Sequence, residues 1–284
     1  MLSSILTKNN VLAGQPFCQQ GSLQVAVQGQ QEPLPASLIL VLDCSGSMEG
    51  RPMELLNAGL RSVVEGLRPD DTLSVVAFGS NAEVILKEAS KEQIYSQGVP
   101  TLSNMGSTNY QEALETTIRL IQSIRVTDPY GDNVARQRAG TVLFFSDGKP
   151  DFGRAREDLV FEIIGRGYTF HTMGLGGGVD PSTLLAMAEN GGGLYRHAKT
   201  EDELQEHLNQ VLSFSQSLVF SAPVLEINVM PGVRVNNVCL IAPPRELVSE
   251  IPEGGTETVT LPDIQAGGML EIGFEVCVDD PGVE

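Results

Sequence analysis

The segment Asp-Cys-Ser-Gly-Ser at positions 43–47 constrains the fold more than any other part of this chain of 284 residues. It directly follows residues 37–42, an apolar run that is typical of a fully buried strand. It precedes residues 53–64, whose apolar positions have the spacing of an amphipathic helix. One carboxylate and two hydroxyls therefore leave the carboxyl end of a strand, where open parallel sheets bind their ligands. All three are hard oxygen donors, a set that suits Mg²⁺ better than Zn²⁺.

Two other loops carry residues of the same chemistry. Thr108 lies just before an amphipathic helix that begins at Asn109, and Asp147 follows residues 140–146, a second buried strand. Taken alone, the segment 43–47 is as typical of a strand-to-helix turn in which Ser or Asp caps the helix. The three loops together favour a metal site, and its candidate ligands are Asp43, Ser45, Ser47, Thr108 and Asp147.

The order of these motifs resembles a known family. Asp-x-Ser-x-Ser, a distant Thr and a strand that ends in Asp-Gly is the pattern of the von Willebrand factor A family and its metal-ion-dependent adhesion site. The resemblance covers roughly residues 36–215. It implies that Ser45, Ser47 and Thr108 contact the metal directly, and that Asp43 and Asp147 act largely through bound water.

Such a site implies a function in protein recognition. If neutral hydroxyls fill most of the inner sphere, the cation keeps positive charge facing solvent. An Asp or Glu of a partner protein can then complete the coordination, and no step breaks a covalent bond. The resemblance therefore implies a Mg²⁺-dependent protein–protein interaction module that is not an enzyme, with Mn²⁺ or Ca²⁺ as alternative ions.

The elements between residues 36 and 217 predict an α/β fold, because strands and helices alternate. The pattern is typical of a doubly wound, mostly parallel sheet with helices on both faces. The expected strands are 37–42, 72–78, 83–86, 140–146, 168–173 and 193–197. The expected helices are 53–64, 91–97, one that begins at Asn109, 155–166, 181–189 and one from about 201 to 217. The last helix carries an apolar stripe of Leu204, Leu208, Val211 and Leu212, and is expected to pack on the sheet. In the resembled family, sliding of this helix couples the metal site to the rest of the molecule; static packing is the alternative.

The flanking residues predict a different architecture. Residues 22–30 alternate apolar and polar side chains, and the chain after residue 217 contains only strand patterns separated by Pro and Gly clusters. Antiparallel strands with short turns are typical of a β-sandwich. We therefore expect residues 1–35 to add one or more strands to a β-sandwich, residues 36–217 to form the α/β domain, and residues 218–284 to supply the other sandwich strands. The α/β domain is then inserted in the sandwich or followed by it.

The charge of the chain argues against two classes of partner. The net charge is −18, and residues 218–284 hold eleven acidic side chains against two basic ones. Such a surface repels nucleic acid and anionic lipid, so we expect neither as a partner. We also find no apolar run of about 18 residues that would predict a membrane span.

The cysteines and the N-terminus predict a cytoplasmic protein. Cys18, Cys44, Cys239 and Cys277 show no Cys-x-x-Cys spacing, which favours free thiols in a reducing compartment. The first residues lack the basic start and apolar core of a secretory signal. We therefore expect a subunit or adaptor of an intracellular multiprotein system. An exported adhesion module is the alternative, and a disulfide from Cys239 to Cys18 or Cys277 would support it.

Two other functions are compatible with parts of this sequence. Asp43 at a strand end could serve as the nucleophile of a Mg²⁺-dependent phosphotransferase or phosphatase. Such enzymes usually place a second carboxylate two residues later, where this chain has Ser45, and Lys149 is the only basic residue next to a motif. A metal-free structural scaffold is the other alternative. The three histidines share no metal-ligand spacing, so a structural role is expected for each.

Overall fold

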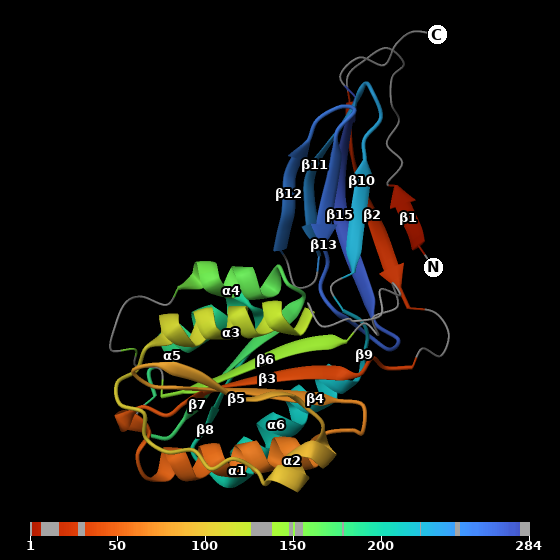
Figure 1. Cartoon of the computed structure of the whole chain (residues 1–284). Helices are drawn as coiled ribbons and strands as arrows, with labels where there is room; N and C mark the ends of the chain where they lie inside the picture. The colour runs from red at the N-terminus through yellow and green to blue at the C-terminus, as the bar shows by residue number, and fades with distance from the viewer. Residues whose placement is uncertain are drawn as a thin grey trace. The chain divides into compact units, whose positions relative to one another are not determined.

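The chain forms two compact units in the computed structural model (Figure 1). The model describes residues 2–6, 17–27, 32–125, 138–147, 150, 156–177, 179–221, 223–241 and 245–278. Pro33–Ser221 form the first unit, called here the α/β unit. Met1–Glu32 and Ala222–Glu284 form the second, the β unit, so the α/β unit lies between the two halves of the β unit in the sequence.

A six-stranded sheet is the centre of the α/β unit. Its strand order is β5-β4-β3-β6-β7-β8, and every neighbouring pair is parallel except β4 with β5. The strands are β3 (Ala36–Asp43), β4 (Thr72–Phe78), β5 (Ala82–Ala89), β6 (Ala139–Ser146), β7 (Tyr168–Leu175) and β8 (Gly192–Ala198), with a short β9 (Leu218–Phe220) at the end of the unit. Every residue of β3 and β6 is buried, which explains why both are continuous apolar runs in the sequence. The predicted mostly parallel sheet is confirmed.

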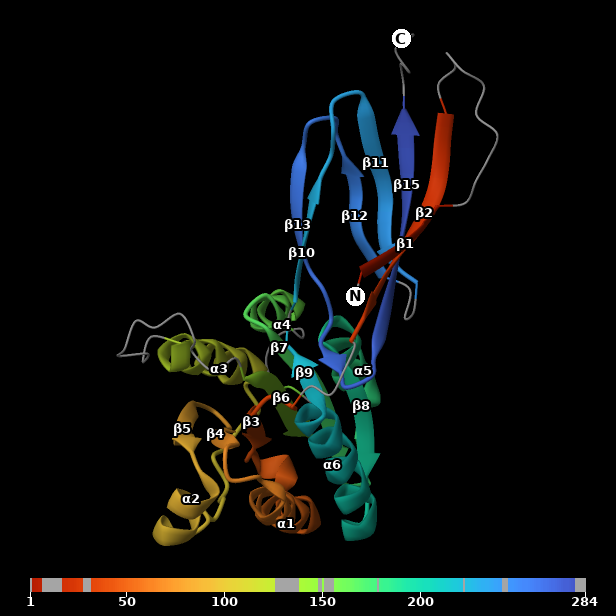
Figure 2. The ribbon, with the colours of Figure 1, turned by 90° about the vertical axis from the view of Figure 1, so that its right-hand side faces the viewer.

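Helices cover both faces of this sheet (Figures 1 and 2). One face packs against α1 (Arg51–Gly66), α2 (Lys91–Gln97) and α6 (Glu201–Gln216), and the other against α3 (Tyr110–Arg125), α4 (Glu157–Ile164) and α5 (Pro181–Asn190). Successive residues of β3 point to opposite faces, so Leu38, Leu40 and Leu42 join the first core while Ile39 and Val41 join the second. No helix in the described ranges has both the length and the apolarity needed to cross a bilayer.

The last helix of the unit packs as its sequence predicts. Its apolar stripe, Leu204, Leu208, Val211 and Leu212, is buried against α1 and the sheet. Its start is fixed by a capping box, in which Thr200 Oγ1 accepts from the Glu203 amide and Glu203 accepts from the Thr200 amide. The position of α6 is therefore set both by burial and by its cap.

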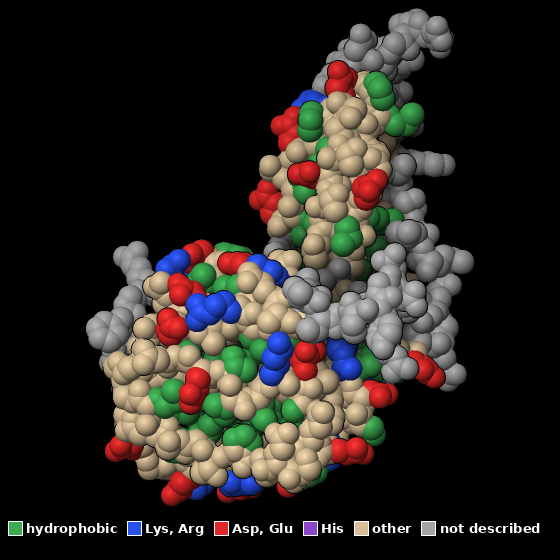
Figure 3. Space-filling model, viewed as in Figure 1, with side chains coloured by type: hydrophobic (Ala, Val, Ile, Leu, Met, Phe, Trp, Pro, Cys, Tyr) green, Lys and Arg blue, Asp and Glu red, His purple; other side chains and the backbone are tan. Residues whose placement is uncertain are grey.

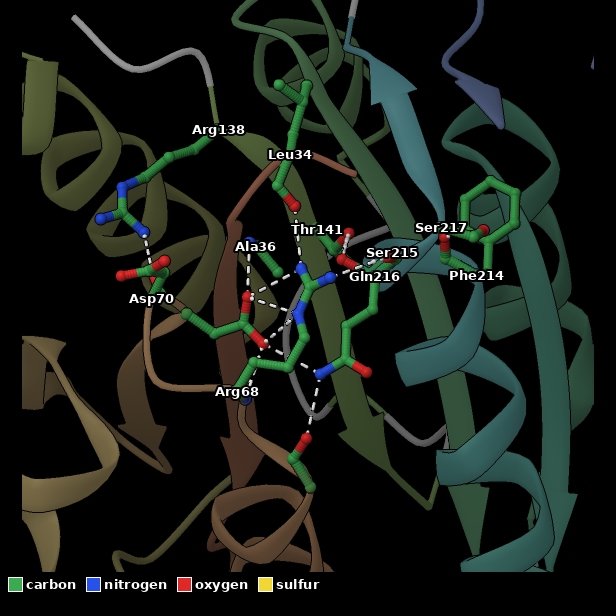
Figure 4. A network of polar contacts seen from close by, with 12 residues as sticks. Leu34, Ala36, Arg68, Asp70, Arg138, Thr141, Phe214, Ser215, Gln216 and Ser217 are labelled. Atoms are coloured by element: carbon green, nitrogen blue, oxygen red, sulfur yellow. Dashed lines mark hydrogen bonds and ion pairs between the residues drawn. The ribbon is translucent and has the colours of Figure 1, made fainter. Parts of the chain in front are cut away.

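A network of polar side chains lies at the amino ends of the parallel strands of the α/β unit (Figure 4). Asp71 is fully buried and accepts hydrogen bonds from the amides of Ala36 and Arg68 at 2.8 and 2.9 Å. The Arg68 side chain pairs with Asp71 at 3.0 Å, and donates to the carbonyl oxygens of Leu34 and Gln216. Gln216 Nε2 donates back to Asp71 at 2.9 Å. The network thus links the residues at which the chain enters the unit to those at which it leaves α6.

The β unit contains two antiparallel sheets. The larger has the order β1-β2-β15-β11-β12, and the smaller pairs β10 with β13. The strands are β1 (Leu2–Leu6), β2 (Phe17–Ala26), β10 (Val224–Asn228), β11 (Val233–Leu240), β12 (Arg245–Ile251), β13 (Thr256–Thr260) and β15 (Met269–Val278), with a short β14 (Ile264–Gln265). Side chains of both sheets, such as Ile227, Leu240 and Ile272, share one hydrophobic core. Acidic side chains are spread over the face of this unit seen in Figure 3, rather than gathered at one point.

Two cysteines of the β unit form a disulfide. Cys18 on β2 lies directly opposite Cys277 on β15, with the two Cα atoms 4.0 Å apart. The prediction of free thiols is therefore wrong for this pair. The two residues are 259 positions apart, and only the pairing of the first long strand with the last brings them together. Cys44 and Cys239 are free, as predicted.

Candidate metal centre

The candidate ligands lie at the carboxyl ends of the central strands. Asp43 is the last residue of β3, and Asp147 directly follows β6. These two strands are parallel neighbours, with Leu42 opposite Phe145. Ser45 and Ser47 belong to the turn after β3, which forms a short 3-10 helix (Gly46–Met48). Two carboxylates and two hydroxyls therefore come from adjacent loops of one sheet edge.

Asp43 is a buried carboxylate with both oxygens held by the protein. Its side chain is 0% exposed. Asp43 Oδ1 accepts from the Ser45 amide at 2.9 Å, and Oδ2 accepts from Ser146 Oγ at 2.5 Å. Burial raises the pKa of Asp43 to about 6, and the nearby charge of Asp147 adds to the rise, although the hydrogen bonds from Ser146 and Ser45 lower it. A cation at this point would favour the ionised form.

The loop that carries Thr108 is joined to the loop after β3. The Gly46 amide donates to the Gly106 carbonyl at 2.7 Å, and the Met105 amide donates to the Cys44 carbonyl at 2.6 Å. Ser45 and Ser47 place their hydroxyl oxygens 3.1 Å apart on the same turn. Thr108 is 2% exposed and lies two residues before α3. The structure thus brings the Thr108 loop beside the serine turn.

A close backbone approach supports the Thr108 loop from the other side. The Asn109 amide donates to the Gly79 carbonyl at 3.1 Å, and the Ser80 amide donates to the Met105 carbonyl at 2.9 Å. A Cβ atom on Gly79 would collide with the backbone of Met105, so this position requires glycine. Gly79 and Ser80 were not predicted as part of the site, since a Gly-Ser pair after a strand is also an ordinary turn.

Three other residues near the ligands, Ser146, Tyr110 and Asn104, were not identified from the sequence. Ser146 bonds to Asp43, and the Tyr110 hydroxyl donates to Ser146 Oγ at 2.6 Å. Asn104 Nδ2 donates to Glu49 Oε1 at 2.6 Å beside the serine turn. A polar residue at the very end of the apolar strand 140–146 was the only sequence feature that pointed to Ser146. Lys149, the basic residue considered for phosphate chemistry, lies outside the described residues.

The donor set fits a hard divalent cation. Three hydroxyls and two carboxylates are oxygen donors, the ligands that Mg²⁺, Mn²⁺ and Ca²⁺ take in proteins. Cys44 is the only cysteine between residues 33 and 221, and burial together with the charges of Asp43 and Glu83 raises its pKa to about 12. Cys44 therefore stays a neutral thiol packed in the core, and the site offers no thiolate for a soft metal. The buried Asp43 carboxylate is the group whose charge such an ion would balance.

Comparison with protein families identifies one match. A family model for the von Willebrand factor type A domain matches residues 36–197, which is more than half of the chain. The Synechocystis protein sll0103, whose name describes it as uncharacterised, is 24% identical over 274 residues, covering 93% of this chain and 63% of that protein. Inter-alpha-trypsin inhibitor heavy chain H3 from Bos taurus is 27% identical over 172 residues, covering 57% of this chain and 19% of the heavy chain. The chain thus spans less than two thirds of the length of each of these relatives.

Solved structures show the same fold. A von Willebrand factor type A protein from Catenulispora acidiphila superposes with a TM-score of 0.71 at 16% identity, covering 99% of this chain and 66% of that one. The ArnB paralog VWA2 from Sulfolobus acidocaldarius gives 0.58 at 16% identity, covering 100% of this chain and 67% of that one. Proximal thread matrix protein 1 from the mussel byssus, in a form with a zinc-occupied MIDAS motif, gives 0.51 at 20% identity and covers 67% of this chain and 48% of that one.

Proposed function

Because the chain belongs to the von Willebrand factor type A family, we propose that it is a metal-dependent protein–protein interaction module. The cation would be held at the carboxyl edge of the α/β sheet by Ser45, Ser47 and Thr108 directly, and by Asp43 and Asp147 through water. The observation that carries this proposal is the Asp43 carboxylate, which is fully buried beside neutral hydroxyls. A buried carboxylate is costly to ionise unless a positive charge lies close to it.

The partner would supply an Asp or Glu. A bound divalent cation provides a positive charge that a carboxylate can reach from outside. The three hydroxyls carry no charge, and Ser47 is exposed, so the site would keep positive charge on its open side. Magnesium is the ion that we propose, with manganese or calcium as alternatives, since all three take oxygen ligands. The site would bind a cation and a partner carboxylate, and we assign no enzymatic reaction to it.

The disulfide leads us to propose an exported location in place of the cytoplasm. Disulfides persist in oxidising compartments and are rare in the cytosol. The Cys18–Cys277 bond therefore favours an exported location over the cytoplasm that we expected from the sequence. We propose that the module binds its partner outside the cytosol, as one part of a larger assembly.

We also propose that the two units are separate domains. The α/β domain of residues 36–217 would be inserted between the strands of a β-sandwich built from residues 1–35 and 218–284. Two antiparallel sheets that share one core support this reading of the β unit.

The first experiment tests whether the chain binds a divalent cation through the assigned ligands. Titration of Mg²⁺ and Mn²⁺ into EDTA-treated protein should show one saturable site by calorimetry. Ser47→Ala should weaken binding without unfolding the chain, because the Ser47 side chain is exposed. Ser96→Ala, which removes an exposed hydroxyl on α2, is the matched control and should bind as wild type does. Wild-type affinity in Ser47→Ala would contradict the assigned ligand set.

Partner recognition needs a second experiment. Extracytoplasmic proteins of the source cells would be passed over the immobilised chain in Mn²⁺ and eluted with EDTA. The proposal expects a protein that is retained by wild type and Ser96→Ala but not by Ser47→Ala. Its acidic residues would then be replaced one at a time, and a single Asp or Glu should abolish retention. Retention that survives EDTA would contradict metal-dependent recognition.

A further inference from the structure

A chain of buried hydrogen bonds reaches Asp43 from helix α3. The Tyr110 hydroxyl donates to Ser146 Oγ over 2.6 Å, and Ser146 Oγ donates to Asp43 Oδ2 over 2.5 Å. Asp43 and Ser146 are fully buried and Tyr110 is 1% exposed, so bulk water does not compete for these bonds. We call Tyr110, Ser146 and Asp43 the buried relay.

The ring of Tyr110 is fixed by its neighbours. It packs edge-on against Phe144, with ring centres 4.9 Å apart and planes at 76°. It makes a similar contact with Phe78 at 5.9 Å and 83°. Both phenylalanines are fully buried, and edge-to-face pairs of this kind are the geometry that aromatic rings prefer. The Tyr110 hydroxyl therefore holds a defined position relative to β4 and β6.

The buried relay joins all three loops that carry candidate ligands. Asp43 ends β3 just before the serine turn. Tyr110 is the first residue of α3, two residues after Thr108, and Ser146 directly precedes Asp147. Two hydrogen bonds thus connect loops that are far apart in the sequence. A shift of any one loop would break a bond in a site that water cannot reach, which is costly.

We propose that Tyr110 and Ser146 are positioning residues of the metal centre, which orient the Asp43 carboxylate and hold the three ligand loops together. This inference rests on the proposed function, since it concerns the affinity of that site for its cation. Asp43 Oδ1 is held by the Ser45 amide, so the bond from Ser146 fixes the second oxygen and leaves the carboxylate one orientation. In the proposed site Asp43 orients water bound to the ion, and outer hydrogen bonds of this kind set metal affinity by fixing the groups around the ion.

The first test removes one hydroxyl and keeps the ring. Tyr110→Phe leaves both aromatic contacts intact but takes away the donor to Ser146. We expect the affinity for Mn²⁺, measured by calorimetric titration of the full chain, to fall by about 10-fold or more. Ser146→Ala breaks the relay next to the carboxylate and should weaken binding at least as much.

A second tyrosine provides the matched control. Tyr168 is 6% exposed, and its hydroxyl lies 3.4 Å from Ser37 Oγ at the amino ends of the same sheet. Tyr168→Phe deletes the same atom from the same core, far along the strands from the ligands. Its Mn²⁺ affinity should equal that of wild type, whereas a general loss of core polarity would weaken both variants alike.

A spectroscopic readout separates positioning from stability. The chain has five Tyr and no Trp, so its near-ultraviolet spectrum above the phenylalanine bands is dominated by tyrosine. Metal binding should change the hydrogen bond of the Tyr110 hydroxyl and give a tyrosine difference spectrum in wild type and in Tyr168→Phe. The same difference should be lost in Tyr110→Phe even at saturating Mn²⁺.

The outcomes distinguish this inference from the proposed function. Wild-type affinity in folded Tyr110→Phe, with the difference spectrum retained, overturns the relay alone. Failure of the wild-type chain to bind Mn²⁺ overturns the proposed function itself. If Tyr110→Phe does not fold, Ser146→Thr decides the question, because it keeps the hydroxyl. Affinity near that of wild type supports the relay, and a loss as large as in Ser146→Ala contradicts it.

Discussion

Replacing Asp71 by alanine should destabilise the α/β unit by about 3 kcal/mol, because it leaves a buried network without its acceptor. Three donors that now bond to Asp71 at 2.8–2.9 Å would lose their partner, namely the amides of Ala36 and Arg68 and the side chain of Gln216. A buried donor left unsatisfied costs about 1–3 kcal/mol. The Ala36 amide is buried, whereas the Arg68 amide and the Gln216 side chain are partly buried, so their cost lies at the low end of this range. The Arg68 side chain is 34% exposed, so water can solvate its charge, and the total should stay near the lower end of that sum.

Urea unfolding followed by far-ultraviolet circular dichroism is a suitable assay. All helices in the described ranges belong to the α/β unit, so the signal at 222 nm reports that unit. With a slope of about 2 kcal/mol per molar urea, a loss of 3 kcal/mol lowers the midpoint by about 1.5 M. The pair formed by Arg51 and Glu54 is the matched control, since it has the same sequence spacing but side chains that are 54% and 67% exposed. Glu54→Gln should cost less than about 1 kcal/mol.

The same network predicts the sign of a pH effect. Burial alone would raise the pKa of Asp71, but bonds from the Arg68 side chain and from the amides of Ala36 and Arg68 hold it below its ordinary value of 3.8. A carboxylate with a lowered pKa stabilises the fold above that value, and the contribution is lost as pH falls through the folded-state pKa. The difference between wild type and Asp71→Ala should therefore shrink below about pH 4. A loss of less than about 1 kcal/mol at pH 7, or no dependence on pH, would refute this reasoning.

Other regions carry predictions of their own. Burial and the charge of Arg196 lower the pKa of His171 from 6.5 to about 4, so the unfolded chain takes up the proton first. The unfolding free energy should thus fall by roughly 3 kcal/mol as pH drops from 6.5 to 4, and unfolding curves of His171→Gln should show a smaller fall. The Cys18–Cys277 bond closes a loop with a sequence separation of 259, so replacing both by Ser should cost the β unit about 2–5 kcal/mol by calorimetry. Because the disulfide lies in the β unit and the candidate ligands in the α/β unit, that variant should bind Mn²⁺ with wild-type affinity. A loss of Mn²⁺ affinity in the variant would contradict the proposal that the two units are separate domains. Gly79→Ala should cost about 1–3 kcal/mol and weaken Mn²⁺ binding, since its Cβ would displace Met105; wild-type affinity and stability would contradict the close approach.

The strands and helices of the α/β unit were largely predictable because their side chains repeat at short range. The run 37–42 is the buried core of β3, and the predicted helix at 91–97 is α2. The strand expected at 83–86 extends over Ala82–Ala89, and its pairing with β4 is irregular. Glu88 takes a positive φ of 45°, and its amide donates to Ser74 Oγ, a tertiary contact. Such a backbone irregularity leaves no trace in an apolar pattern.

Contacts between distant segments were beyond the reach of sequence patterns. Residues 68–71 lie between an expected helix and an expected strand, yet Arg68 and Asp71 connect both ends of the unit. The Cys18–Cys277 pair depends on the pairing of β2 with β15. The bond from Ser146 to Asp43 likewise depends on the register of β3 with β6. In each case the residues belong to no local sequence motif, and only the topology of the fold brings them together.

Diffraction from crystals grown with Mn²⁺ and collected near the manganese absorption edge tests the central claim most directly. A single anomalous peak at the carboxyl edge of the sheet, within about 2.3 Å of the hydroxyl oxygens of Ser45, Ser47 and Thr108, is the result that we predict. Asp43 and Asp147 should then face the ion across ordered water. No peak at this edge, or a peak bound only to other residues, would contradict a metal-dependent interaction site built from these five side chains.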